Sequence, residues 1–279
     1  MIDTHCHIDD PQYAEGLDAF LRAQRQDGVE AILVPGVEAA TTQDVLDVCA
    51  KYPGYLYPAL GLHPENVKED WREQLAVIKK SVDELQGVRS LNSRTLEQHN
   101  VRLEHLSTAN CRLVAIGEIG LDYHWDTTFR QEQHEALREQ LRWAEEYDLP
   151  VMIHSRDATE DTLKILREFP SVKGVMHCFS GSHEVAKQVV EMGYYLGIGG
   201  VLTFKNCKLA EHLVGIPLES LVLETDAPYM APVPYRGKRN ESRWMCYVAE
   251  RLAQVYGCSV EHVIEQTSAN ATSLFRLKL

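Results

Sequence analysis

The sequence has no long apolar run and no closely spaced cysteine pair, and these absences exclude several classes of protein. No stretch approaches the roughly 20 apolar residues that a membrane-spanning helix needs. The N-terminal residues lack a basic region followed by an apolar stretch, so we predict no signal peptide. Seven cysteines occur without a Cys-x-x-Cys motif, which argues against a disulfide framework and favours a reducing, cytoplasmic compartment.

Positive charge is also scarce, because 28 Lys and Arg residues face 41 Asp and Glu residues, giving a formal net charge of -13. This balance argues against a protein that coats nucleic acid electrostatically. It does not exclude an enzyme that acts on phosphates, because bound divalent cations would make its site locally positive. No Pro/Gly/Ser-rich linker interrupts the 279 residues, so we expect a single domain over 1–279.

Apolar, β-branched runs alternate with segments of helical periodicity such as the one containing Leu137, Leu141 and Ala144. The expected strands are Met1–His5, Ala31–Pro35, Leu56–Leu60, Leu113–Glu118, Pro150–His154, Gly174–Cys178, Tyr194–Ile198 and Leu221–Thr225. Eight such units predict an α/β fold of the closed (β/α)8 TIM-barrel type. A doubly wound open sheet is the alternative, because periodicity does not reveal closure.

Residues 87–112 interrupt this alternation between a helix expected to end near Gln86 and the fourth strand. Leu96, Leu103 and Leu106 have roughly helical spacing, so an extra helix is predicted. A helix-to-strand connection lies on the bottom face of a barrel, away from the chemistry. We therefore expect a surface or self-association element and not a specificity loop.

The first strand ends in a histidine pair, Ile2-Asp-Thr-His5-Cys-His7. Residues two apart in an extended chain point to the same side, so His5 and His7 can bind one cation together. A chance pair near a terminus is the alternative. Metal-type residues that recur at later strand ends weaken that alternative.

Further imidazole and carboxylate groups end other expected strands. They are His63, Glu118, His154, His177 and Asp226. Each alone is usually a loop, cap or turn residue. Together they occupy the C-terminal ends of the strands, where the active sites of such barrels are built.

Imidazole and carboxylate ligands suit zinc, manganese, iron or nickel, and a bridging carboxylate is typical of two-metal hydrolases. Glu118 is the candidate bridge. His5, His7 and Asp226 would hold one metal, and His154 and His177 the other. Strands one and eight are neighbours in a closed barrel, and strands four to six are consecutive, so both sets are geometrically possible.

Arg236 lies in a basic segment, Pro234–Asn240, after the eighth strand. Barrels often bind phosphate with the loops after strands seven and eight, and arginine offers a bidentate fork for phosphate oxygens. A solvated basic loop is the alternative. Arg156, two residues after His154, is a second candidate contact for a substrate.

The assembled motifs resemble those of the TatD family of metal-dependent deoxyribonucleases over essentially the whole chain. They are Ile2–His7, Gly61–Pro64, Gly117–Tyr123, His154–Arg156, His177–Gly181, Glu224–Tyr229 and Arg236–Glu241. The resemblance implies a TIM barrel with two divalent metals. It assigns His5, His7, Glu118 and Asp226 to one metal and Glu118, His154 and His177 to the other. It places His63 close to the substrate.

The pattern therefore predicts an enzyme that hydrolyses DNA, by implication exonucleolytically, with two divalent cations, Mg, Mn or Zn, and with Asp226 and Glu118 as catalytic residues. Asp226 would orient or deprotonate the attacking water. One rival is a carbonyl hydrolase on the same scaffold, cleaving an amide, a lactone or an aminoacyl ester such as aminoacyl-tRNA. Another is a non-catalytic binding protein. No membrane or obligate protein partner is predicted.

Overall fold

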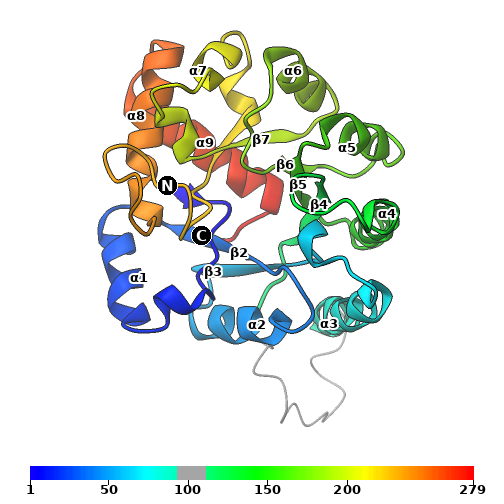
Figure 1. Ribbon diagram of the computed structural model, residues 1–279. Helices are drawn as coiled ribbons and strands as arrows, with labels where there is room; N and C mark the ends of the chain where they lie inside the picture. The colour runs from blue at the N-terminus through cyan, green and yellow to red at the C-terminus, as the bar shows by residue number, and fades with distance from the viewer. Residues whose placement is uncertain (93–110) are drawn as a thin grey trace.

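The computed structural model describes residues 1–92 and 111–279, in which eight parallel strands form one sheet in sequence order. The strands are β1 (Ile2–Asp3), β2 (Ala31–Pro35), β3 (Leu56–Leu60), β4 (Ala115–Asp122), β5 (Val151–Arg156), β6 (Gly174–Met176), β7 (Tyr195–Ile198) and β8 (Leu221–Leu223). Every adjacent pair is parallel. Figure 1 shows helices surrounding this central sheet.

Helices follow the strands around the barrel. They are α1 (Leu17–Gln26), α2 (Thr42–Lys51), α3 (Trp71–Asn92), α4 (Arg130–Tyr147), α5 (Thr159–Leu166), α6 (His183–Glu191), α7 (Leu209–His212), α8 (Met245–Tyr256) and α9 (Val260–Phe275). Within the described ranges, no helix combines the length and the apolar character needed to cross a bilayer.

Alternate strand residues divide the core into two apolar layers. Ile32 and Val34 of β2 face outward and belong to the large cluster that includes helix residues such as Leu141. Ala31 and Leu33 face inward and belong to a smaller cluster inside the barrel. That inner cluster also contains Phe275 of α9, so the last helix covers one end of the barrel (Figure 1).

The barrel closes between β1 and β8 through backbone hydrogen bonds. The N–H of Thr4 donates to the carbonyl of Leu223 at 3.1 Å, and the N–H of Asp226 donates to that of His5 at 2.9 Å. Further along, the N–H of His7 donates to the carbonyl of Ala227 at 2.8 Å. The segments that carry His5, His7 and Asp226 are thereby fixed to each other. The closed barrel expected from the sequence is confirmed, and the open sheet is excluded.

Several strand boundaries differ from those expected. β2 and β3 agree, but β4 continues four residues beyond Glu118, and β6 and β8 each end two residues early. After β6 and β8 the chain leaves the sheet through Cys178 and Asp226, whose φ angles of 46° and 55° are incompatible with a strand. Glu118 and His154 therefore lie within their strands, which corrects their expected placement at strand ends.

Helix α3 also exceeds its expected end near Gln86 and runs to Asn92. A single glycine, Gly87, costs a helix only about 1 kcal/mol, which does not end a helix anchored by buried side chains such as Ile78 and Val82. The remaining part of the expected insertion, 93–110, with Leu96, Leu103 and Leu106, lies outside the described residues. Its helix and its placement stay predictions.

We expect Gly174→Ala to destabilise the barrel by about 2–4 kcal/mol, because no space exists for a side chain there. A Cβ atom at Gly174 would lie 2.1 Å from the carbonyl oxygen of Val151, the residue with which it pairs across β5 and β6. Denaturant unfolding measures this loss. The matched control is Gly87→Ala, where nothing lies within 4 Å, and which should stabilise by about 0.5–1 kcal/mol. Equal stability of the Gly174 variant and the wild type would contradict the packing described.

Candidate metal centre

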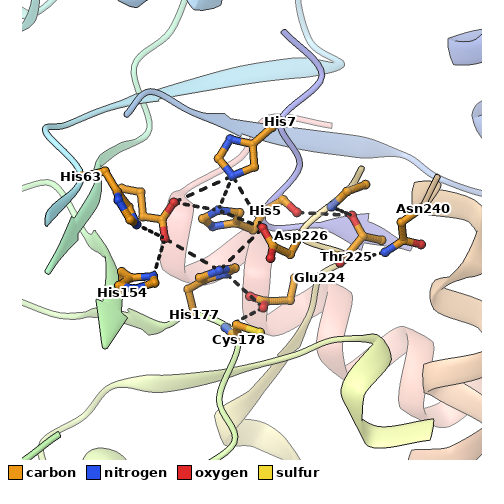
Figure 2. A network of polar contacts seen from close by, with 12 residues as sticks. His5, His7, His63, His154, His177, Cys178, Glu224, Thr225, Asp226 and Asn240 are labelled. Atoms are coloured by element: carbon orange, nitrogen blue, oxygen red, sulfur yellow. Dashed lines mark hydrogen bonds and ion pairs between the residues drawn. The ribbon is translucent and has the colours of Figure 1, made fainter. Parts of the chain in front are cut away.

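The metal-type residues expected from the sequence converge at the C-terminal mouth of the barrel (Figure 2). They line a cleft of about 910 Å³ together with loop residues that follow several strands. His7, Glu118, His154, His177 and Asp226 all belong to its lining. His5 lies directly beneath, with a fully buried side chain.

Glu118 reaches this cleft because the pairing of β4 with β5 shifts register between Ile116 and Ile119. Ala115 faces the barrel interior, and strict alternation would then turn residue 118 outward. Ile116, Ile119 and Leu121 instead all lie in the outer cluster, so one extra residue is accommodated between the two isoleucines. The irregularity directs the Glu118 carboxylate into the barrel mouth.

The two carboxylate oxygens of Glu118 face different histidines. Oε2 lies 3.2 Å from Nε2 of His5 and 3.9 Å from Nε2 of His7. Oε1 lies 3.1 Å from Nδ1 of His154 and 3.4 Å from Nε2 of His63. The same carboxylate therefore belongs to two potential ligand groups, as a bridging ligand must.

Asp226 and His177 lie beside the rings of His5 and His7. Oδ1 of Asp226 is 3.6 Å from Nε2 of His7, 3.9 Å from that of His177 and 4.0 Å from that of His5. The rings of His5 and His177 stack with centroids 3.5 Å apart. His177 therefore lies as close to the His5 group as to Glu118 Oε1, from which its Nε2 is 3.8 Å distant.

The donor set fits divalent cations. Nε2 of His5 and Nε2 of His7 are 3.3 Å apart. Two nitrogens that share one zinc ion at 2.0–2.1 Å in tetrahedral geometry would be about 3.3 Å apart. A second group, His63, Glu118 and His154, also has its potential ligand atoms within 4.8 Å of one another.

The electrostatics of the centre differ between its buried rings, because burial and the neighbouring His177 lower the pKa of His5 whereas nearby carboxylates raise the pKa of His177. Burial lowers the pKa of His177, but the carboxylates of Glu224 and Glu118 raise it to about 10. Burial raises the pKa of Glu118, but the imidazoles of His63, His5 and His177 hold it well below its usual range. The pKa of Asp226 is lowered as well, so Glu118 and Asp226 favour their ionised forms and stabilise nearby cations, which is the condition that a metal centre needs.

Two supporting carboxylates were not identified from the sequence, although both stand in the motifs quoted above. Oδ2 of Asp122 lies 2.8 Å from Nε2 of His154, which leaves Nδ1 of that ring toward Glu118. Oε1 of Glu224 lies 3.1 Å from Nδ1 of His177 and accepts a 2.7 Å hydrogen bond from the N–H of Cys178. Such contacts fix the orientation of ligating imidazoles. Their spacing from the ligands, two or four residues along the chain, was the available signal.

Backbone geometry makes room for Glu224. A Cβ atom at Gly197 of β7 would lie 2.0 Å from Oε2 of Glu224, so only glycine fits opposite this carboxylate.

Asp3 holds the base of the centre. Its Oδ1 accepts hydrogen bonds from the N–H groups of His5 and Thr225, and its Oδ2 accepts one from Oγ1 of Thr225 at 2.6 Å. The side chain of Asn240 donates to the carbonyl of Thr225 at 2.9 Å (Figure 2). These bonds set the positions of both His5 and the adjacent Asp226.

The three residues expected at the substrate occupy different places. His63 joins the potential ligand group around Glu118, besides lining the cleft. Arg156 is exposed and lines the cleft. Arg236 lies elsewhere, with its guanidinium carbon 4.4 Å from the ring centroid of Phe204, and its contact with substrate stays a prediction.

Comparison with known proteins identifies the family. A family model described as TatD related DNase matches residues 2–276. The chain belongs to the TatD family. YabD of Bacillus subtilis, described as an uncharacterized metal-dependent hydrolase, is 38% identical over 280 residues, covering 99% of both chains. Human deoxyribonuclease TATDN3 is 32% identical over 283 residues, covering 99% of this chain and 94% of its own.

Solved structures agree. The crystal structure of YjjV, a TatD homolog from Escherichia coli, superimposes with a TM-score of 0.80 at 33% sequence identity, covering 100% of this chain and 98% of that one. This TatD protein is accordingly a metal-dependent hydrolase, and the family, the fold and the enzyme class expected from the sequence are confirmed.

We expect Glu224→Gln to weaken metal binding by about 10- to 100-fold, because the amide keeps the shape but removes the negative charge beside His177. Titration calorimetry with Zn²⁺ or Mn²⁺ measures the affinity. Glu219→Gln, on the exposed surface before β8, is the matched control and should bind like the wild type. A folded Glu224 variant with unchanged affinity would show that this carboxylate does not support the centre.

Proposed function

We propose that this TatD protein hydrolyses phosphodiester bonds of DNA exonucleolytically, starting from a strand end, with two divalent cations bound around Glu118. The observation that carries the proposal is the division of the Glu118 oxygens between two sets of imidazoles. The proposal of DNA as the substrate is supported by the match to a family described as related to DNases and by a relative named deoxyribonuclease.

The proposed ligands are those that the family motifs indicate, and their distances to Glu118 and Asp226 are compatible with this assignment. His5, His7, Asp226 and Oε2 of Glu118 would hold one cation, and Oε1 of Glu118 with His154 and His177 would hold the other. His63 lies close enough to the second group to contribute a nitrogen or to contact the substrate. When bound, such a pair of cations lowers the pKa of a water and neutralises charge on phosphate and leaving oxygen.

Asp226 acts as the general base in this proposal. Its carboxylate lines the cleft, and although burial raises its pKa, the hydrogen bond to His7 and the charges of the neighbouring histidines lower it overall. An ionised carboxylate at the mouth can accept a proton from the attacking water. The backbone bond from its N–H to the carbonyl of His5 holds it in place.

Digestion of end-labelled single- and double-stranded oligonucleotides with Mg²⁺, Mn²⁺ or Zn²⁺ tests the function. The wild type should shorten DNA and lose this activity in chelator. Asp226→Asn should lose about 10²–10⁴-fold in kcat with little change in KM, because the amide nearly keeps the shape but accepts no proton.

An aminoacyl-ester substrate is the informative comparison. Turnover of an aminoacyl-tRNA analogue without cleavage of DNA under any of the three metals would replace the proposal with a carbonyl hydrolase. Near-normal kcat in Asp226→Asn would place the base elsewhere.

We expect Arg156→Ala to raise KM for DNA by about tenfold, because Arg156 lines the cleft and its guanidinium can pair with a phosphate. Arg156→Lys should restore only part of the loss, since the bidentate fork is gone. Arg236→Ala is the matched comparison and should raise KM less, because Arg236 lies against Phe204. Steady-state kinetics with one oligonucleotide measures all three. The reverse order of effects would assign the phosphate contact to Arg236.

A further inference from the structure

Trp125 is the most exposed large apolar side chain in the cleft. It lies three residues after β4, and 69% of its surface is accessible to solvent. It lines the same cleft as Glu118 and His154. Exposing the apolar surface of an indole to water is unfavourable in free energy. Exposed aromatic groups beside an active site are typical of ligand contacts.

The surroundings of Trp125 hold the indole without covering it. The guanidinium carbon of Arg156 lies 5.2 Å from its ring centroid, and the His124 ring meets it edge-on at 4.6 Å. His124 is itself held by Asp157, with Nδ1 and Oδ2 2.9 Å apart. Trp125 is therefore positioned by a cation and an imidazole, and most of its surface remains accessible.

Two carboxylates in this region are paired with basic side chains. Asp126 lies 3.5 Å from the ammonium group of Lys68, and Asp157 pairs with His124. Arg156 is the cation on the cleft side. Its guanidinium beside the indole can contact an anion, although the chain as a whole is acidic.

Trp125 and Arg156 also lie next to the metal centre. His154 and Arg156 are two residues apart in β5, so their side chains share a face and their Cα atoms are about 6.6 Å apart. Asp122, three residues before Trp125, pairs with Arg156 in the sheet and contacts His154. A ligand that touches the indole can therefore also reach the centre.

We propose that Trp125 and Arg156 form a nucleotide subsite in which a nucleobase stacks on the indole while the adjacent phosphate contacts the guanidinium. The inference rests on the proposed function and adds to it the residue that recognises the base. Stacking tolerates any base, because every base has a π-face, so this subsite distinguishes nucleotides from other phosphodiesters without reading sequence.

Two substrates separate stacking from other roles. One is an oligothymidylate, and the other has the same backbone with every base replaced by an abasic tetrahydrofuran residue. The wild type should cleave the oligothymidylate and bind it with an affinity about tenfold higher than its affinity for the abasic chain. Trp125→Leu, which keeps apolar volume, should lose about tenfold in KM and in equilibrium binding on oligothymidylate and almost nothing on the abasic chain. Trp125→Phe should retain most of the affinity.

The control is Val214→Ala, an exposed apolar position after α7 that does not line the cleft, which should change neither substrate. Equal losses on both substrates in Trp125→Leu, or no loss on either, would overturn the subsite while leaving the nuclease function intact. A wild type that cleaves neither substrate with any of the three metals would overturn the proposed function itself.

Discussion

The carboxylate of Glu118 is the group on which the rest of the centre depends. It is 3% exposed in the mouth of the barrel, where an isolated negative charge would be costly. Imidazoles that follow β1, β3 and β6, and one within β5, surround it and keep its pKa well below the usual range. Because its two oxygens face different rings, a single buried charge organises two adjacent ligand groups.

Closure of the barrel supplies the other half of the geometry. β1 and β8 are short, and the backbone bonds that join them lie partly beyond the strands, at His5, His7 and Asp226. Asp3 reinforces this junction by accepting bonds from both segments. The first and last strands are thus held together next to His5, His7 and Asp226. The bonds that close the barrel therefore also position these side chains.

Sequence patterns were sufficient where burial alone decides structure. The apolar runs of β2 and β3 are buried at every position, and their ends match the expected ones. The histidines and Asp226 could be proposed as ligands because imidazole and carboxylate groups recur after such runs. These patterns are local in the chain, so they can be recognised without knowledge of the fold.

The missed features depend on contacts between distant segments. The register shift that turns Glu118 inward is set by pairing of β4 with β5, which periodicity does not show. The partnership of Glu224 with His177 depends on space at Gly197 in another strand. His63 lies among potential ligands only because β3 and β5 face the same cavity. Trp125 is notable only by its exposure, a property of the folded chain.

Anomalous X-ray diffraction from crystals soaked with Mn²⁺ or Zn²⁺ would locate the cations bound around Glu118. Two peaks should flank the Glu118 carboxylate, each about 2.0–2.2 Å from a different oxygen of that residue. One peak should also contact His5 and His7, and the other His154. A single peak, or two peaks that share no contact with Glu118, would contradict the account.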